Sequence, residues 1–430
     1  MSWGTRFRVR EWLDRSWIVI PSLYVVAALV LGKLIPALED GGRGPLGFSL
    51  EHDSARDILQ AVAAGMIAFT GFVVSVAVVV VQFGASQYTP RLVLRFRRDS
   101  VVKHSLGIFI APAIYALVSL GDVKDGDVPN LTVAVAVLLL VGAVFAFFAL
   151  TARLLDLLRP RRLYAQLRAG CEAAIDQVYP RPPSGPASGA DQSLPTPGEL
   201  VSHSGPSGVL SALDFPLLLS TATAADMVIE VALPIGSYVH SGGLLLRLHG
   251  PAAGIPDSEL ERAAIVAEER TLTQDPAFAI RAVVDIAIRA LSPAVNDPTT
   301  AVQGLDVLEA ILHRLVQRDL GAGLLRDAAG TPRVVYPAPD WPDLLDLALT
   351  EIRFYGAPSH QVTRRMRALL DDLLLAASPA RRPAVEAQLT LLSRAIERAH
   401  PDPAERTLAS AADHMGLGSR VTGTGTGDAP

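Results

Sequence analysis

The stretch AVAAGMIAFTGFVVSVAVVVVQF, residues 61–83, contains no charged side chain. A helix needs about 20 mostly apolar residues to cross the hydrocarbon core of a bilayer, so we predict a membrane span here. Three further stretches have a suitable length and composition: residues 17–38, residues 131–150, and residues 106–120 with an extension to residue 101. The chain is therefore predicted to begin with a four-helix transmembrane domain, residues 1–160.

One face of the span at residues 61–83 carries small residues at helical spacing: Gly65, Ala68, Gly71 and Ser75. Small residues allow two helices to approach closely. The stripe has two interpretations at this point. It packs against other helices of the same bundle, or it packs between subunits around an axis, where an apolar pore would gate by dewetting.

The charges of the chain are distributed unevenly. Residues 1–162 carry five more Lys/Arg than Asp/Glu, and residues 163–430 carry ten more Asp/Glu than Lys/Arg. The positive residues gather in three flanks: the N-terminus before residue 16, residues 91–103, and residues 153–162. Because Lys and Arg accumulate on the cytoplasmic side of short loops, we predict an inner-membrane protein of bacteria with both termini in the cytoplasm. The lipid bilayer is then its first partner.

The rest of the chain is predicted to be an α+β region. A juxtamembrane helix and a flexible Pro/Gly/Ser-rich linker occupy residues 161–207. The pattern then predicts a small β-rich module, residues 208–252, and a helical domain, residues 253–415, that includes a helix over 257–271 and a strand over 333–336. Residues 416–430 are predicted to be a disordered tail. The fold class is a membrane α-helical bundle followed by this mixed region.

Several chemistries are excluded by composition. One cysteine permits no internal disulfide and no CxxC site, and the absence of lysine beyond residue 124 excludes a Walker A loop or a Schiff-base enzyme there. Asp306, Glu309 and His313 share a helix face, but no HExxH pattern supports a metal site. The acidic back part argues against nucleic-acid binding. We predict no catalytic residue, no cofactor and no metal.

The strongest candidate for a binding site is the stretch of residues 270–300. It gathers arginines and polar side chains around two turns, and a later helix adds two more candidates: Arg270, Arg281, Asp285, Arg289, Asn296, Asp297, Thr299, Arg353 and Tyr355. Guanidinium groups and free helix N-termini suit an anion or a phosphate. The alternative is structural, with an Arg281–Asp285–Arg289 ladder and two acidic helix caps at Asp275 and Asp297.

Four segments together resemble a bacterial family of predicted integral membrane proteins that is described only as a domain of unknown function. These segments are residues 11–15, residues 86–91, residues 353–356, and residues 275–301 with the core Leu291-Ser292-Pro293-Ala294-Val295-Asn296-Asp297-Pro298. The resemblance extends from about residue 5 to residue 400, and the Ser-Pro-x-x-Asn-Asp-Pro segment is its most specific part. It implies a membrane protein and supplies no activity, cofactor or catalytic residue.

Three functional hypotheses remain open. The first is a homo-oligomeric, channel-like or transport protein with a cytoplasmic cap. The second is a membrane-anchored sensor or scaffold that binds a small anionic ligand or a protein partner of unknown identity. The third is a membrane-anchored enzyme that uses Asp285, Asn296 and Asp297, although no recognised catalytic pattern supports it.

Overall fold

The protein is described here by a computed structural model, which covers residues 16–38, 51–87, 99–122, 130–157, 159–179, 198–250, 255–320 and 323–418. The chain divides into two compact units. The N-terminal unit comprises residues 5–160, and the C-terminal unit comprises residues 161–430 together with residues 1–4. Each unit is described by itself.

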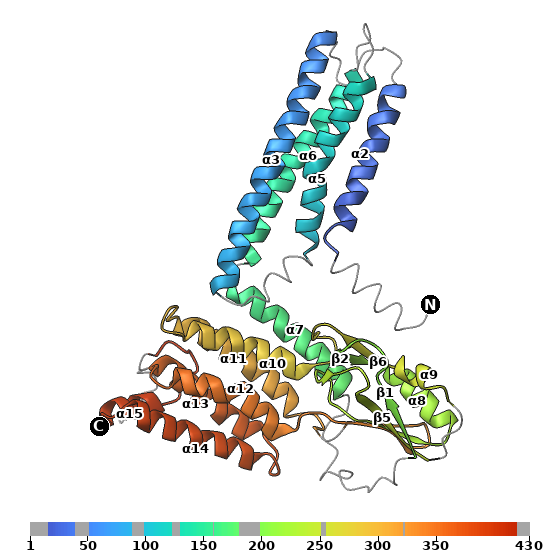
Figure 1. Cartoon of the computed structure of the whole chain (residues 1–430). Coiled ribbons are helices and arrows are strands. Elements are labelled where there is room, and N and C mark those ends of the chain that lie inside the picture. The colour runs from blue at the N-terminus through green and yellow to red at the C-terminus, as the bar shows by residue number, and fades with distance from the viewer. Residues whose placement is uncertain are drawn as a thin grey trace. The chain divides into compact units, whose positions relative to one another are not determined.

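The N-terminal unit contains four long helices (Figure 1): α2 (Val19–Ala37), α3 (His52–Gln87), α5 (Ser100–Asp122) and α6 (Asn130–Leu157). All four are long and apolar enough to cross a membrane, so the four predicted spans are confirmed. The third of these helices, α5, begins at Ser100, so residues 100–105 form its first turns. The predicted extension of this span to residue 101 is therefore correct.

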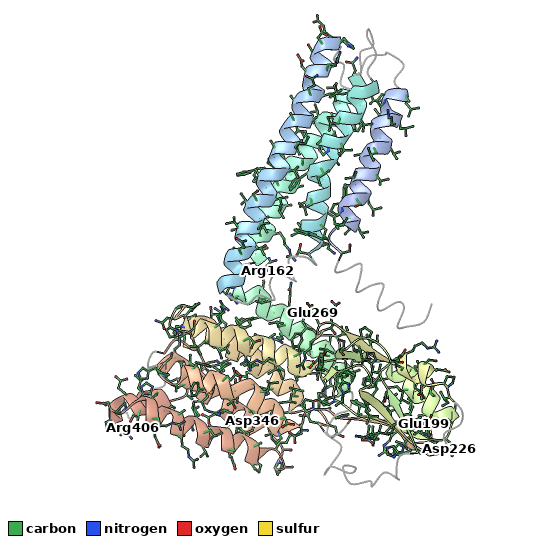
Figure 2. The ribbon with its side chains drawn as sticks, in the orientation of Figure 1. Arg162, Glu199, Asp226, Glu269, Asp346 and Arg406 are labelled. Carbon is green, nitrogen blue, oxygen red and sulfur yellow. The ribbon has the colours of Figure 1, made fainter. Side chains whose placement is uncertain are left out.

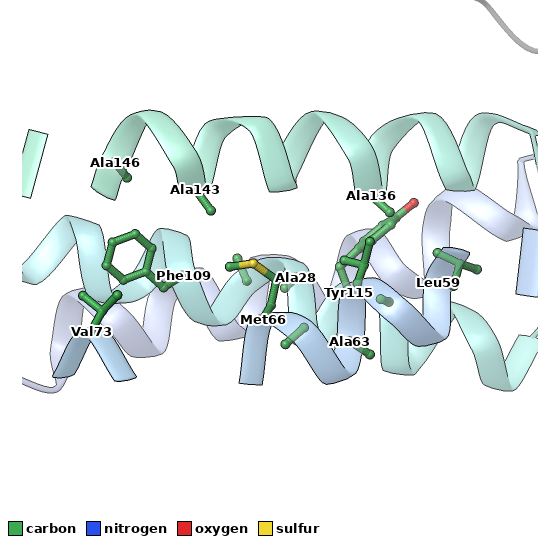
Figure 3. Packing of buried hydrophobic residues seen from close by; sticks show 14 of the residues in the cluster. Ala28, Leu59, Ala63, Met66, Val73, Phe109, Tyr115, Ala136, Ala143 and Ala146 are labelled. Atoms are coloured by element: carbon green, nitrogen blue, oxygen red, sulfur yellow. The ribbon is translucent and has the colours of Figure 1, made fainter. Parts of the chain in front are cut away.

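Helix α5 is the central helix of this bundle, since it packs against α2, α3 and α6 and has the largest buried share of the four. Phe109 and Tyr115 of α5 are fully buried, and Figure 3 shows them within the cluster of buried residues to which α3 and α6 also contribute. The ring of Phe109 packs edge-on against Phe69 of α3, with centroids 5.5 Å apart, and the hydroxyl of Tyr115 donates to the carbonyl of Thr132 of α6 at 3.2 Å. The two aromatic residues of α5 thus fix its packing on both neighbours.

Two of the predicted positive flanks meet at one end of the bundle. Oδ1 of Asp99 accepts hydrogen bonds from the backbone N–H groups of Val101 and Val102, at 3.0 and 3.3 Å. Its Oδ2 accepts from Nε of Arg153, at 2.8 Å. The start of α5 and the end of α6 therefore lie on the same side, as the charge pattern requires.

The C-terminal unit combines helices with two antiparallel-rich sheets. The five-stranded sheet has the order β1 (Glu199–Ser202), β5 (Leu244–His249), β3 (Val228–Val231), β8 (Pro332–Tyr336) and β7 (Gly323–Arg326). The three-stranded sheet has the order β4 (Tyr238–Val239), β2 (Gly208–Leu213) and β6 (Ala264–Ala267). Neighbouring strands pair antiparallel except β3 and β8, which are parallel.

The sheets differ from the prediction in their extent. Strand β1 lies within the segment that we predicted as a linker, and β6 replaces the second half of the helix predicted over residues 257–271, of which only α9 (Asp257–Glu261) is helical. The reason is non-local pairing: β6 pairs with β2, and Ile265 and Leu210 are buried in this pair. Strands β7 and β8 belong to the five-stranded sheet, so the β part of the chain extends beyond residues 208–252. Residues 180–197 of the predicted linker and residues 419–430 of the predicted tail lie outside the described residues.

Helices form the remainder of the C-terminal unit: α7 (Pro160–Val178), α8 (Phe215–Ala224), α10 (Pro276–Ala290), α11 (Pro298–Leu315), α12 (Trp341–Gly356), α13 (His360–Ala376), α14 (Arg382–Ala399) and α15 (Pro403–Ser410). The pairs α10–α11, α10–α12, α11–α13, α12–α14 and α13–α14 pack against each other. Helix α7 is anchored to this layer, because the hydroxyl of Tyr164 donates to the carbonyl of Thr300 at 3.1 Å. The predicted juxtamembrane helix is thus a built-in element of the C-terminal unit.

Candidate functional site

Residues 291–298, the segment that carries the most specific resemblance, form the connection between α10 and α11. The N–H of Asn296 donates to the carbonyl of Ser292, and the N–H of Asp297 donates to the carbonyl of Ala290. Asn296 adopts a left-handed conformation, with φ of 48°, which asparagine tolerates better than most residues. Asp297 then caps α11 by accepting from the N–H and the hydroxyl of Thr300. Each of these residues has a role in the turn itself.

Arg270 and Asp275 form an ion pair before α10. Nε and Nη2 of Arg270 donate to Oδ2 of Asp275 at 2.9 and 2.6 Å, while Oδ1 of Asp275 accepts from the N–H of Phe278 and caps the helix. The Asp275 side chain is only 3% exposed. Burial raises the pKa of Asp275, and Arg270 acts in the opposite direction. Because both oxygens of Asp275 and the fork of Arg270 are engaged, this pair has a structural role.

Arg281 connects α10 to α12. It donates to Asp285, one turn along α10, at 2.6 Å, and to both carboxylate oxygens of Glu351. The hydrogen bond from Arg281 lowers the pKa of Glu351. The Arg281–Asp285 contact agrees with the first half of the structural ladder that we gave as the alternative to an anion site, and Glu351 is a partner outside that ladder. Anion binding at Arg281 stays a prediction.

Replacing Glu351 with glutamine is expected to lower the stability of the C-terminal unit by less than about 1 kcal/mol near pH 7, because the Glu351 side chain is 43% exposed. Its pKa is lowered in the folded state, so the stabilisation is complete above the unfolded value of about 4.3 and is lost as the pH falls through the folded value. Thermal melting of chains with and without Glu351→Gln, in which Trp3, Trp12 and Trp17 are replaced by phenylalanine so that fluorescence reports on the buried Trp341, measures this. A difference between the two that does not shrink as the pH falls below about 4.3 would contradict it.

The other predicted site residues are distributed over separate contacts. Nη1 of Arg353 donates to the side-chain oxygen of Gln388 on α14, and Nε2 of Gln388 donates to Asp346, which is labelled in Figure 2. The hydroxyl of Thr299 accepts from Gln361 at 3.4 Å. Tyr355 is exposed and packs edge-on against Phe354. Arg289 occupies the last turn of α10. The described contacts therefore do not bring these residues together into one pocket.

The acidic face of α11, which we considered as a metal site, is engaged by an arginine instead. Arg365 of α13 donates to Asp306 at 2.7 Å and also to Glu309. Nε2 of His313 lies 4.0 Å from Glu309. The side chain of Arg365 is buried, so its charge requires these two carboxylates. This explains the spacing of the acidic residues without a metal.

The small-residue stripe of α3 faces away from the described bundle. Gly65, Ala68, Gly71 and Ser75 are exposed in the single chain, and no described atom lies within 4 Å of where a Cβ would stand on Gly65 or Gly71. The opposite face of α3 supplies the core residues, among them Leu59, Met66 and Val73. The bundle therefore does not use the stripe to pack its own helices. Packing between subunits stays a prediction.

A groove borders the stripe. It encloses about 430 Å³ and is almost wholly apolar, with one wall from α3 and one from α6. The α3 wall includes Ile58, Ala61, Gly65 and Phe69, and the α6 wall includes Leu140 and Ala143. The sequence pattern indicated the α3 wall but contained no signal for the α6 wall.

One cluster of ionisable side chains was missed by the sequence analysis. His360, His400 and Glu405 each offer a ligand atom, and these atoms lie within 4.8 Å of one another. They come from the start of α13, the end of α14 and the first turn of α15. Only their arrival at one point in the fold reveals the cluster, because the two histidines are 40 positions apart in sequence.

Comparison with known proteins agrees with the helical architecture. A family model described as "Predicted membrane protein (DUF2254)" matches residues 14–372. Uncharacterized proteins of Mycobacterium bovis and of Mycobacterium tuberculosis are each 30% identical over 437 residues, which covers 97% of this chain and 82% of theirs. No solved structure matches the chain. With four apolar helices and this match over most of its length, the chain is a multi-pass membrane protein and belongs to the DUF2254 family of predicted membrane proteins.

Proposed function

We propose that this protein is a homo-oligomeric, channel-like protein of the bacterial inner membrane, with both termini in the cytoplasm. The positive flanks support the orientation. The observation that carries the oligomer is a contrast between glycines of the same bundle. A Cβ on Gly107 would lie 2.4 Å from the ring of Tyr24, and one on Gly32 would lie 2.9 Å from Val118. These two glycines serve close packing within the chain.

Gly65 and Gly71 have no such role within the chain, because no described atom occupies the space beside them. A glycine in the middle of a helix costs roughly 0.5–1 kcal/mol relative to alanine. No contact inside the bundle offsets this free-energy cost. A helix of a second copy that packs on this face would explain it, since small residues favour helix association in membranes. The groove between α3 and α6 continues the same face and can receive side chains of that copy.

An assembly around α3 would line its axis with small and apolar side chains. Such a constriction conducts when it is hydrated and closes when it dries. The spans of the described chain keep their charged side chains near the helix ends, as with Asp99 and Arg153. A dewetting gate therefore fits this unit better than a relay of buried charges through the membrane.

A cysteine at Ala68 tests the association. Oxidation of native membranes is expected to cross-link Ala68→Cys chains into dimers, whereas Val26→Cys, exposed near the middle of α2, is expected to stay monomeric. The native Cys171 is fully buried and does not compete. Equal cross-linking of the two variants, or a monomer in nanodiscs, would refute the oligomer.

Reconstitution into planar bilayers tests the channel. Wild type is expected to show conductance steps under voltage or membrane tension, and Gly71→Leu is expected to abolish them by separating the subunits. An oligomer without conductance would refute the channel and leave a scaffold.

The sensor hypothesis is the second candidate, and a hollow in the C-terminal unit favours it. The hollow encloses about 460 Å³ between α7 and α11 and is lined by Arg161, Arg168 and Gln303, among others. Oε1 of Gln303 is buried without a hydrogen-bond partner among the described residues, which suits a ligand that carries a donor. If the cross-linking experiment yields a monomer, a ligand-binding role becomes the better supported function.

A further inference from the structure

We propose that His360, His400 and Glu405 form a binding site for a divalent transition-metal ion, with zinc as the best probe. Two imidazoles and one carboxylate are a ligand set that zinc takes in proteins, usually with water in the fourth position. The inference concerns only the C-terminal unit and does not depend on the proposed oligomer or channel.

The distances between the three ligand atoms are close to those of a zinc site, but the side chains have to move to bind an ion. Zinc ligands stand about 2.0–2.2 Å from the metal, so tetrahedral donor atoms are about 3.4 Å apart. The three candidate atoms already lie within 4.8 Å of one another. The side chains of His360 and Glu405 are 29% and 53% exposed, so they can close the remaining gap without disturbing a packed core.

His400 is prepared to act as a ligand. It is buried, and its Nε2 lies 2.9 Å from the carbonyl of Ala357. A carbonyl can only accept, so Nε2 donates to it, and Nδ1 is the nitrogen that His400 can offer to an ion when it carries no proton. Metal-binding histidines are commonly oriented by such a bond to a backbone carbonyl.

His360 already directs one ring nitrogen at Glu405. Its Nε2 contacts the carboxylate of Glu405 at 2.5 Å, while its buried Nδ1 has no hydrogen-bond partner among the described residues. An ion at Nε2 replaces the contact with Glu405, because it binds both groups. It also places the ring proton on Nδ1, and the metal–ligand bonds have to exceed the cost of that N–H without an acceptor.

The two rings are stacked, with centroids 4.6 Å apart and planes that differ by 22°. A metal ion lies in the plane of each imidazole that binds it, so the partly exposed His360 ring has to turn away from the buried His400 ring for both to bind one ion. The negative end of α14 at His400 favours a cation, and the positive ends of α13 and α15 oppose it. The Glu405 carboxylate therefore decides the sign of the local charge.

An ion held by these three residues would tie three helices together. α15 is a short helix of eight residues, and Figure 2 marks it by Arg406, the neighbour of Glu405. Asp402 caps it, and Asp413 follows with a backbone bond to Arg364 of α13. Metal binding would fix this last helix on the ends of α13 and α14.

The test uses the full chain in nanodiscs, without a polyhistidine tag. Isothermal titration with zinc is expected to give one site per chain, and cobalt is expected to give the visible absorption of a low-coordinate complex. Glu405→Gln and His360→Asn are expected to weaken zinc binding by more than the roughly 10- to 100-fold that loss of a supporting hydrogen bond costs. Magnesium should not bind at the site, because it prefers oxygen ligands.

The matched control is His414→Gln. His414 also pairs with a carboxylate, Asp372, at 3.3 Å, but it is not part of the three-residue cluster. This variant is expected to bind zinc like wild type. Zinc should also slow hydrogen exchange in residues 403–410 of wild type and not of Glu405→Gln. Absence of a stoichiometric site, or equal zinc affinity in wild type and Glu405→Gln, would overturn the proposal and leave His360–Glu405 as an ion pair.

Discussion

Gly236→Ala is expected to destabilise the C-terminal unit by clearly more than the roughly 1 kcal/mol that a positive φ costs an alanine, because it also separates the half-buried Arg270–Asp275 ion pair. A Cβ at this position would lie 2.2 Å from Nη2 of Arg270 and 2.5 Å from Oδ2 of Asp275. Arg270 can swing outward, but Asp275 is buried and holds the cap of α10. Its carboxylate would then be left buried without its partner.

The same chain supplies a matched control for this prediction. Gly242 also has a positive φ, 80° against 93° for Gly236, but no described atom lies within 4 Å of its Cβ position. Gly242→Ala is expected to cost only the backbone term, about 1 kcal/mol. Thermal melting followed through Trp341 compares the two variants. Equal losses would mean that the Arg270–Asp275 pair contributes little to the unit.

Gly107→Leu is expected to prevent correct assembly of the four-helix unit. A Cβ alone would lie 2.4 Å from the ring of Tyr24, and that ring is fixed by its hydroxyl, 3.1 Å from Nδ1 of His104. Overpacking of this kind costs about 1–3 kcal/mol and more for a large side chain. Helices α2 and α5 would have to separate along their contact.

Gly65→Leu is the contrasting variant in the same unit. No described atom lies beside Gly65, so the single chain should fold with wild-type stability while cross-linking at Ala68→Cys falls. Resistance to unfolding in mixed detergent micelles measures the first effect, and oxidation of membranes measures the second. If Gly65→Leu unfolds the chain as Gly107→Leu does, the stripe belongs to the bundle after all.

The spans were predictable because the signal for a membrane helix is local. Some 20 apolar residues in a row are required whatever the rest of the chain does, and α2, α3, α5 and α6 satisfy this by composition. The helix caps were local as well. Asp275 and Asp297 each precede a proline and each accept an N–H three residues on, as the sequence indicated.

The strands were harder to predict because their stability comes from partners elsewhere in the chain. β1, β6 and β7 have four residues each, too few to show a period. β6 exists because β2 pairs with it, and β8 joins the sheet through β3, about 100 residues earlier in the chain. The sequence pattern therefore placed a helix where β6 lies and a linker where β1 lies.

In the candidate site, too, the contacts within one helix were predictable and the contacts between distant segments were not. The sequence indicated Arg281 and Asp285 as a pair, since i and i+4 positions share a helix face. It contained no sign that Glu351, 70 residues further along the chain, accepts hydrogen bonds from Nη1 and Nη2 of Arg281. The histidine cluster likewise required three helix ends to meet.

By itself, then, the sequence determined four membrane spans, the asymmetry of charge between the two parts of the chain, and the helix starts at Asp275 and Asp297. These properties depend on residues within one or two turns of each other. The tertiary structure alone decided that the stripe of α3 faces outward, that Arg281 reaches Glu351 of α12, and that His360, His400 and Glu405 converge. Such outcomes depend on which distant segments pack together, and packing follows from the shape and burial of the whole chain.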